Sequence, residues 1–373
     1  MDITEARSEF PVTRTCAFMN HAAVAPLSQR AVNAMRGLLD DLLANGDQNS
    51  KQWDLAVQRT RELAAQLINA SPSEIAFVKN TTEGIAHVAN GFPWSPGDNV
   101  VVTNVEFPAN VYPWLNLADR GVETRFVKEK AGRIPFEDIS DAIDSRTRIV
   151  SLSYVEFVSG FRNDLGRLGE LCRKRGALFV VDAIQGLGVL KLDVQECGVD
   201  FLSADGHKWL LAPEGAGVFF CSNRVADRIR VSEMGWMAVQ NAGDYLRYPQ
   251  PPRTDARRFE CGSHNTLGLH GLGAAIDLLL EVGIPNIERR VLALTDRLCD
   301  GLARKGYHIF SSRREGEKSG IVSFHKPGQD TRALFQRLRA EKIIVALREG
   351  FIRVSPHFYN SEDEIDRLLA ALP

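Results

Sequence analysis

The segment with the clearest chemical potential is residues 203–210, in which Lys208 follows His207 in a glycine-bearing turn. Lys208 stands 26 residues after Asp182, which closes the apolar run 178–181, a pattern typical of a strand buried on both faces. A lysine amine forms a Schiff base with an aldehyde, and a strand-end carboxylate keeps a pyridine nitrogen protonated. These are the groups that a pyridoxal phosphate (PLP) site requires. A lone lysine is usually a solvated surface charge, so this interpretation depends on its neighbours.

A second candidate group is the stretch Asn-Thr-Thr-Glu-Gly at residues 80–84, where a predicted strand ends and a predicted helix begins. Free backbone N–H groups at a helix start bind anions such as phosphate. The threonines could equally serve as a plain helix cap, just as Asp182 could be a turn residue, Gln185 a polar helix-start group and His207 a residue flanking a turn. Each signal is weak alone, but together, after successive strands, they fit one cofactor.

Length and composition set broad limits. The 373 residues, 44% hydrophobic and 25% charged, are ordinary for a globular protein with room for two domains. The net charge of −2 gives no reason to expect a nucleic-acid or membrane partner. The chain has no apolar run of spanning length and no signal-peptide pattern at its start, so we expect a cytoplasmic protein. The cysteines form no CxxC pair and the histidines no HxxxH pair, so no metal site is expected.

Strand-like and helix-like stretches alternate between about residues 70 and 230. This alternation predicts an α/β fold with a mostly parallel sheet, in which ligands bind at the carboxyl ends of strands. A proline-rich stretch at 243–257 precedes a smaller predicted α+β region. The predicted strands are 75–78, 99–103, 124–127, 148–153, 178–181, 320–324 and 351–354. The predicted helices are 82–90, 109–119, 136–143, 164–175, 267–282, 287–305, 331–341 and 362–372.

From the stretch Phe-Met-Asn-His-Ala-Ala at residues 18–23 to the C-terminus, six segments agree with one family. The chain resembles the class V aminotransferases of PLP fold type I, the branch of cysteine desulfurases, selenocysteine lyases, C–S lyases and isopenicillin N epimerase. The resemblance implies PLP as cofactor and a large domain, residues 15–260, built on a seven-stranded, mostly parallel sheet. It also implies a smaller C-terminal domain, residues 261–373, joined by residues 1–14.

The resemblance assigns roles around the cofactor. Lys208 is implied to be the Schiff-base lysine, Asp182 to pair with the pyridine nitrogen, and Gln185 to bond the phenolic oxygen of the ring. The implied phosphate ligands are Thr81, Thr82 and His207.

Four further roles follow from the same resemblance. Phe107 is implied to stack on the cofactor ring, and Ser263 to reach the phosphate of the other subunit in a homodimer with a shared active site. Arg353 is implied to bind the substrate α-carboxylate, a task that suits a bidentate guanidinium. Asn20 is expected to lie near the substrate.

Three features depart from the family pattern. Residues 342–350 contain no cysteine and leave little room for the loop that carries the desulfurase nucleophile, so a persulfide mechanism is not expected. Phe157 stands where many relatives have an asparagine against the ring oxygen. Asp205 replaces a serine or asparagine at the phosphate, and we expect it to turn away or to bond His207, because an anion beside a phosphate is costly.

The expected chemistry starts with removal of the Cα proton of an amino acid by Lys208, with the substrate held on Arg353. The sequence leaves the next step open between transamination, C–S lysis and epimerisation. Transamination ranks first because the desulfurase cysteine is missing. A PLP-holding protein without turnover is the non-enzymatic alternative, although the retention of Lys208, Asp182 and Arg353 argues against it.

Overall fold

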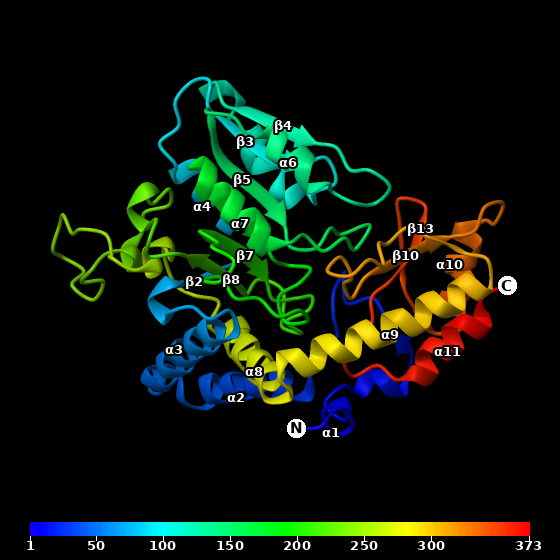
Figure 1. Ribbon diagram of the computed structural model, residues 1–373. Coiled ribbons are helices and arrows are strands. Elements are labelled where there is room, and N and C mark those ends of the chain that lie inside the picture. Colours follow the sequence, from blue (N-terminus) through cyan, green and yellow to red (C-terminus); the bar gives the residue numbers. More distant parts are fainter.

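The computed structural model describes all 373 residues, and a seven-stranded sheet forms its centre (Figure 1). The strand order is β2-β8-β7-β6-β5-β3-β4, and only β8 runs antiparallel to its neighbours. The predicted α/β fold with a mostly parallel sheet is therefore confirmed. The strands are β2 (Ile75–Val78), β3 (Asn99–Thr103), β4 (Glu123–Val127), β5 (Thr147–Ser153), β6 (Leu178–Asp182), β7 (Phe201–Asp205) and β8 (Gly217–Cys221).

The central strands are continuously apolar because both faces of the sheet are covered. Along β6, Phe179 and Val181 pack into one hydrophobic cluster, whereas Leu178 and Val180 pack into a second cluster on the opposite face. The helices between the strands are α4 (Thr81–Gly91), α5 (Tyr112–Leu115), α6 (Phe136–Ala142) and α7 (Leu165–Arg175). Because the strands from β3 to β7 run parallel, their carboxyl ends meet at one edge of the sheet, and the predicted site residues lie there.

Two helices near the N-terminus were not predicted from the sequence. These are α2 (Gln29–Asn45) and α3 (Ser50–Leu67), which pack on α8 (Thr266–Val282) below the sheet (Figure 1). The short helix α1 (Ile3–Arg7) lies nearby. From α8, the long helix α9 (Ile284–Arg304) runs to the C-terminal region. No single helix is long and apolar enough to cross a membrane; α8 and α9 meet that test only as a pair bent by 80°.

A four-stranded antiparallel sheet forms the C-terminal region. Its order is β12-β13-β10-β9, and α9, α10 and α11 lie beside it (Figure 1). Next to it, β1 (Ala17–Phe18) pairs in parallel with β11 (Ile343–Ile344), so the N-terminal segment crosses to this region. The bounds are β9 (His308–Ile309), β10 (Val322–His325), β12 (Ala346–Arg348), β13 (Phe351–Val354), α10 (Thr331–Ala340) and α11 (Glu362–Ala371).

One predicted helix is wrong. The stretch 109–119 is not continuous but consists of a 3₁₀ turn at Pro108–Asn110, α5, and a second 3₁₀ turn at Ala118–Arg120. Pro113 explains the break: proline donates no backbone hydrogen bond and disfavours the helical conformation of the residue before it, so a new helix must start there. The other predicted helices and strands are present, with ends shifted by up to three residues.

Candidate active site

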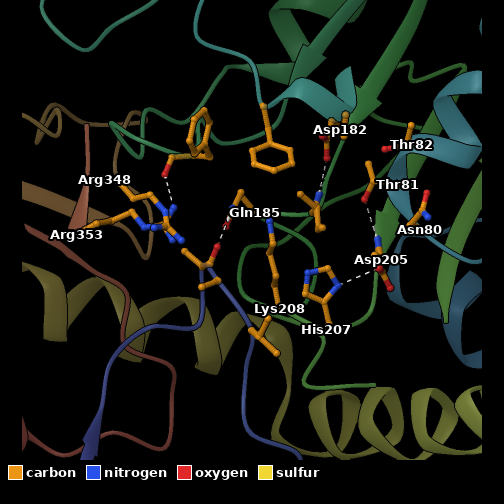
Figure 2. Close-up of a pocket in the computed structure, with 17 residues that line it drawn as sticks. Asn80, Thr81, Thr82, Asp182, Gln185, Asp205, His207, Lys208, Arg348 and Arg353 are labelled. Atoms are coloured by element: carbon orange, nitrogen blue, oxygen red, sulfur yellow. Dashed lines mark hydrogen bonds and ion pairs between the residues drawn. The ribbon is translucent and has the colours of Figure 1, made fainter. Parts of the chain in front are cut away.

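A cavity of about 300 Å³ opens at the carboxyl edge of the central sheet, facing the β12–β13 hairpin. Eight of the ten predicted site residues line it: Thr81, Thr82, Phe107, Asp182, Gln185, His207, Lys208 and Arg353. Figure 2 shows the threonines at one end, Arg348 and Arg353 at the other, and Lys208 between them. The remaining residues of the lining are Ala22, Ala23, Val24, Asn80, Ala109, Phe157, Ile184, Asp205 and Arg348.

Asp182, the last residue of β6, is 1% exposed. One carboxylate oxygen, Oδ1, accepts a hydrogen bond of 3.0 Å from the backbone of Ile184, while the buried Oδ2 has no partner in the chain. Burial raises the pKa of Asp182 to about 6, opposed by the Ile184 N–H and by the charge of Lys208. An unpaired, buried carboxylate oxygen is a group prepared for a cationic or N–H partner.

Lys208 follows β7 and is 7% exposed. Burial lowers its pKa to about 8, while the charge of Asp182 acts in the opposite direction and that of Arg353 adds to the lowering. The ring of Phe107 lies over the amine, with its centroid 5.3 Å from Nζ. At a pKa near 8 a substantial share of the amine is unprotonated at neutral to slightly alkaline pH, which a nucleophile or base needs.

At the opposite end of the cavity, helix α4 begins with Thr81 and Thr82. Its cap is Asn80, whose Oδ1 accepts a 2.9 Å hydrogen bond from the Glu83 backbone. The threonines are therefore not the cap, and the first N–H groups of α4 have no intrahelical partner. Thr81 Oγ1 also accepts a 3.0 Å bond from the backbone of Asp205. This end of the cavity offers the donors that an anion such as phosphate takes.

The Asp205 side chain is directed at His207, one of the two arrangements expected from the sequence. His207 Nδ1 and Asp205 Oδ2 lie 2.9 Å apart, as an ion-pair contact whose geometry does not form a hydrogen bond (Figure 2). The other oxygen, Oδ1, accepts a 2.7 Å bond from the backbone of Gly206. The carboxylate is thus occupied within its own turn.

Gln185 is held in one orientation by two hydrogen bonds. Its Nε2 donates to the carbonyl of Ala22 at 3.1 Å, and its Oε1 accepts from the indole Nε1 of Trp209 at 2.9 Å. The second N–H of the amide has no protein partner, so it is free to donate to a ligand in the cavity. Trp209 was not singled out from the sequence, and no local pattern connects it with Gln185.

The two arginines come from one hairpin. Strands β12 and β13 are joined by a two-residue turn, Glu349 and Gly350, with φ of 47° and 82°. This turn leaves no loop that could carry a desulfurase nucleophile, and none of the six cysteines lines the cavity. Arg353 is buried and donates from Nη1 to the backbone oxygen of Phe157 at 2.7 Å.

Sequence reasoning also missed two buried acids close enough to Asp182 to feel its charge, Glu106 and Glu156. Glu106 accepts hydrogen bonds from the backbone and hydroxyl of Ser153, which is in register with Asp182 on the neighbouring strand. Glu156 accepts a 3.2 Å bond from Asn163. Burial raises the pKa of Glu106 to about 7 and that of Glu156 well above its usual range. The only sequence signal was Glu106, directly before Phe107. An acid at this position attracts attention only once the structure shows that it is buried.

Two predicted residues do not line the cavity. Asn20 lies beside Ser355 in an isolated parallel bridge, and its Oδ1 is buried without a partner. Ser263 is exposed. The implied contact of Asn20 with substrate and of Ser263 with a second subunit both stay predictions.

The residues present fit PLP. One cavity holds the buried Lys208, the strand-end Asp182 with an unpaired oxygen, and the free N–H groups at the start of α4. On a mostly parallel sheet, this combination defines a PLP-dependent enzyme of fold type I.

The comparisons with known proteins agree. The family model for class V aminotransferases matches residues 17–368. A probable cysteine desulfurase of Methanothermobacter thermautotrophicus is 31% identical, covering 99% of this chain and 96% of its own length. The apo structure of a cysteine desulfurase from Thermococcus onnurineus is 25% identical with a TM-score of 0.90, over 98% of this chain and 96% of that one. A cystine C–S lyase bound to its product, cysteine persulfide, is 24% identical with a TM-score of 0.89, over 97% and 98%. The chain belongs to the class V aminotransferase family.

Proposed function

We propose that the protein transfers the amino group of an amino acid to a keto acid, with PLP as carrier. The observation that supports this most directly is the pair of buried atoms without protein partners, Asp182 Oδ2 and Arg353 Nε, belonging to two residues of one cavity with Lys208 between them. Buried polar atoms are normally satisfied. A cofactor and a substrate would supply the missing partners.

Four groups of the chain would hold the cofactor. Lys208 would bind its aldehyde carbon, Asp182 its ring nitrogen, Gln185 its phenolic oxygen, and the start of α4 its phosphate. When bound, PLP supplies an aldehyde for the substrate amine and a ring that accepts electrons from a broken bond at Cα. The side chains of the protein would bind and orient the substrate and move its Cα proton.

Arg353 would bind the α-carboxylate, because a buried guanidinium with free N–H groups favours a carboxylate partner. This contact orients the Cα–H bond toward Lys208. The displaced amine of Lys208, with its lowered pKa, would then take the Cα proton and return it to the cofactor side. Asp182, fixed by Ile184, would keep the ring nitrogen protonated throughout.

Epimerisation is disfavoured by the same lining. Inverting Cα by a two-base route requires a second proton-active group on the face opposite to Lys208. His207 is engaged with Asp205 near the start of α4, and Phe107 carries no titratable proton. One base suffices for transamination and for β-elimination.

A second candidate is C–S β-elimination, favoured by the similarity to a probable cysteine desulfurase. In that reaction Lys208 would take the Cα proton and the thiolate would leave from Cβ, with hydrolysis giving pyruvate and ammonia. Because no cysteine lines the cavity, sulfur would depart as a free thiol or sulfide rather than as a persulfide on the protein.

The experiment that separates the candidates mixes PLP-loaded protein with single amino acids and no keto acid, and follows the absorbance of the bound cofactor together with the products. Transamination predicts one stoichiometric bleaching that a keto acid reverses. Continuous release of pyruvate and sulfide would establish elimination instead. A band that no amino acid perturbs would indicate binding without turnover.

The matched variants are Lys208→Ala and, as control, Lys128→Ala at an exposed lysine. We expect the first to lose both the visible band and turnover, and the second to retain them. Retention of both by Lys208→Ala would refute the proposed role of this residue.

We further propose a cytoplasmic homodimer with an active site completed across the interface, and a division into residues 15–260 and 261–373 with 1–14. The exposure of Ser263 supports the dimer, as do the exposed apolar side chains of Met234, Trp236, Tyr245 and Leu246 in one segment. Sedimentation equilibrium tests the proposed homodimer. A monomer at micromolar concentration would contradict it.

A further inference from the structure

Arg348 and Arg353 lie on the same face of the β12–β13 hairpin. On β13, Arg353 is paired with Ala346 of β12. Arg348 is also on β12, two residues after Ala346, so the two arginines are diagonal neighbours across the hairpin. A slip of one residue in this register would move Arg348 to the other face. The two-residue turn fixes the register, and both side chains reach the same end of the cavity (Figure 2).

Neither arginine has an acidic partner. Arg353 bonds only the backbone oxygen of Phe157, and Arg348 bonds only the carbonyl of Leu347, at 3.1 Å. The two acids that line the cavity are used elsewhere: Asp205 contacts His207, and Asp182 lies at the position proposed for the cofactor ring.

The two cations also affect each other. Burial lowers the pKa of Arg353 to about 9, and the charge of Arg348 adds to this lowering. Two positive charges at one end of a cavity repel each other, and an anion bound between them offsets this repulsion. One α-carboxylate supplies one negative charge, so Arg348, which is exposed to solvent at this end of the cavity, has water but no acidic side chain as a partner.

We propose that Arg348 binds a second anionic group, at the end of the substrate side chain, so that the preferred substrates are amino acids with a side-chain carboxylate or sulfinate. This proposal rests on the proposed function, because it assumes that the α-carboxylate takes Arg353. The arginine–anion contact sets specificity rather than the chemical step.

Binding of ligands that lack an amino group tests the subsite without turnover. Succinate and butyrate have the same carbon chain but two and one carboxylates, and their affinities for PLP-loaded protein are measured by titration calorimetry. We expect a preference for succinate of about 10- to 100-fold, the range of one charge-assisted contact. Equal affinities in the unmutated protein would overturn the proposal without any variant.

Three variants sharpen the test. Arg348→Gln should reduce the succinate-to-butyrate preference at least about tenfold, and Arg348→Lys should keep part of it. Arg120→Gln, at an exposed arginine that does not line the cavity, controls for net charge and should keep the full preference. If Arg348→Gln weakens both ligands equally, the two arginines share the α-carboxylate and the proposal is wrong. An unchanged preference would also overturn it.

Turnover then identifies the source of the anion. The kcat/KM values for aspartate, glutamate and cysteine sulfinate, each relative to alanine, should fall in Arg348→Gln, and the largest fall marks the preferred group. A preference for succinate in a protein that no amino acid bleaches would leave the anion subsite in place but refute the proposed reaction. Bleaching by amino acids without a preference for succinate would support the proposed reaction but refute the anion subsite at Arg348.

Discussion

Replacing Asp182 by asparagine should stabilise the protein without cofactor and destabilise it with cofactor. The substitution keeps the size of the side chain and lets its amide oxygen accept the Ile184 N–H, which Asp182 Oδ1 accepts at 3.0 Å. It removes the charge at Oδ2, which is buried and has no partner. The same carboxylate is therefore a cost in one state and a ligand in the other.

The size of the first effect follows from the pKa. Burial raises the pKa of Asp182 from an ordinary 3.8 to about 6, and each tenfold change in proton affinity is worth about 1.4 kcal/mol. An acid whose pKa is raised on folding destabilises the fold as pH increases from the unfolded value through the folded one. At pH 8 the ionised carboxyl thus costs the cofactor-free protein about 3 kcal/mol. Well below pH 3.8 the carboxyl is protonated in both states and this cost disappears.

With cofactor the sign reverses, because the carboxylate then pairs with a protonated ring nitrogen. Loss of one charge-assisted hydrogen bond should weaken cofactor binding by about 1.5–3 kcal/mol. Turnover should fall further, by about a hundredfold or more, because the charge that develops on the ring loses its partner.

Urea denaturation of wild type and Asp182→Asn, each with and without PLP, measures these differences at pH 8 and at pH 4.5. We expect the cofactor-free variant to be more stable than wild type at pH 8, with the gain shrinking at pH 4.5. A cofactor-free variant that is less stable at pH 8 would show that Asp182 Oδ2 has a protein partner. Unchanged PLP affinity would show that the ring nitrogen lies elsewhere.

Three other predictions address the surroundings of the cavity. The rate of PLP uptake should rise with pH to a midpoint near 8, because burial lowers the pKa of Lys208; stopped-flow absorbance would reveal a midpoint near 10.5 if the lysine were solvated. Gly84→Ala should cost about 1–3 kcal/mol and weaken phosphate binding, since its Cβ would lie 2.3 Å from Ser203 Oγ and push α4 off β7; an unchanged Tm and PLP affinity would refute this packing. Glu260→Gln should cost about 3–5 kcal/mol by stranding the buried Arg61, whose Nη1 lies 2.6 Å from Glu260 Oε1, and a loss below 1 kcal/mol in urea denaturation would show that the pair is hydrated.

Five strands of the central sheet, β2 to β6, were predicted because their signal is local, whereas β7 and β8 were not among the predicted strands. A run such as Leu178–Val181 must be buried on both faces, and few folds other than a covered parallel sheet allow that. Helix α2 was not predicted from the sequence, and only Ala31 and Leu38 of its residues are buried in the structure. Pro113 marked the break in the predicted helix at 109–119, and its effect was overlooked.

The sequence by itself determined the class of chemistry. Lys208, Asp182 and the start of α4 each follow a recognisable strand, and the carboxyl ends of parallel strands meet at one edge, so local patterns were enough to bring them together.

Only the tertiary structure decided how the cavity is charged. The neighbourhood of Arg348 and Arg353 depends on the register of a hairpin, and the altered pKa values of Asp182 and Glu106 depend on burial by residues distant in the chain. Pairing register across strands and desolvation are properties of packed neighbours, which no local stretch of sequence contains.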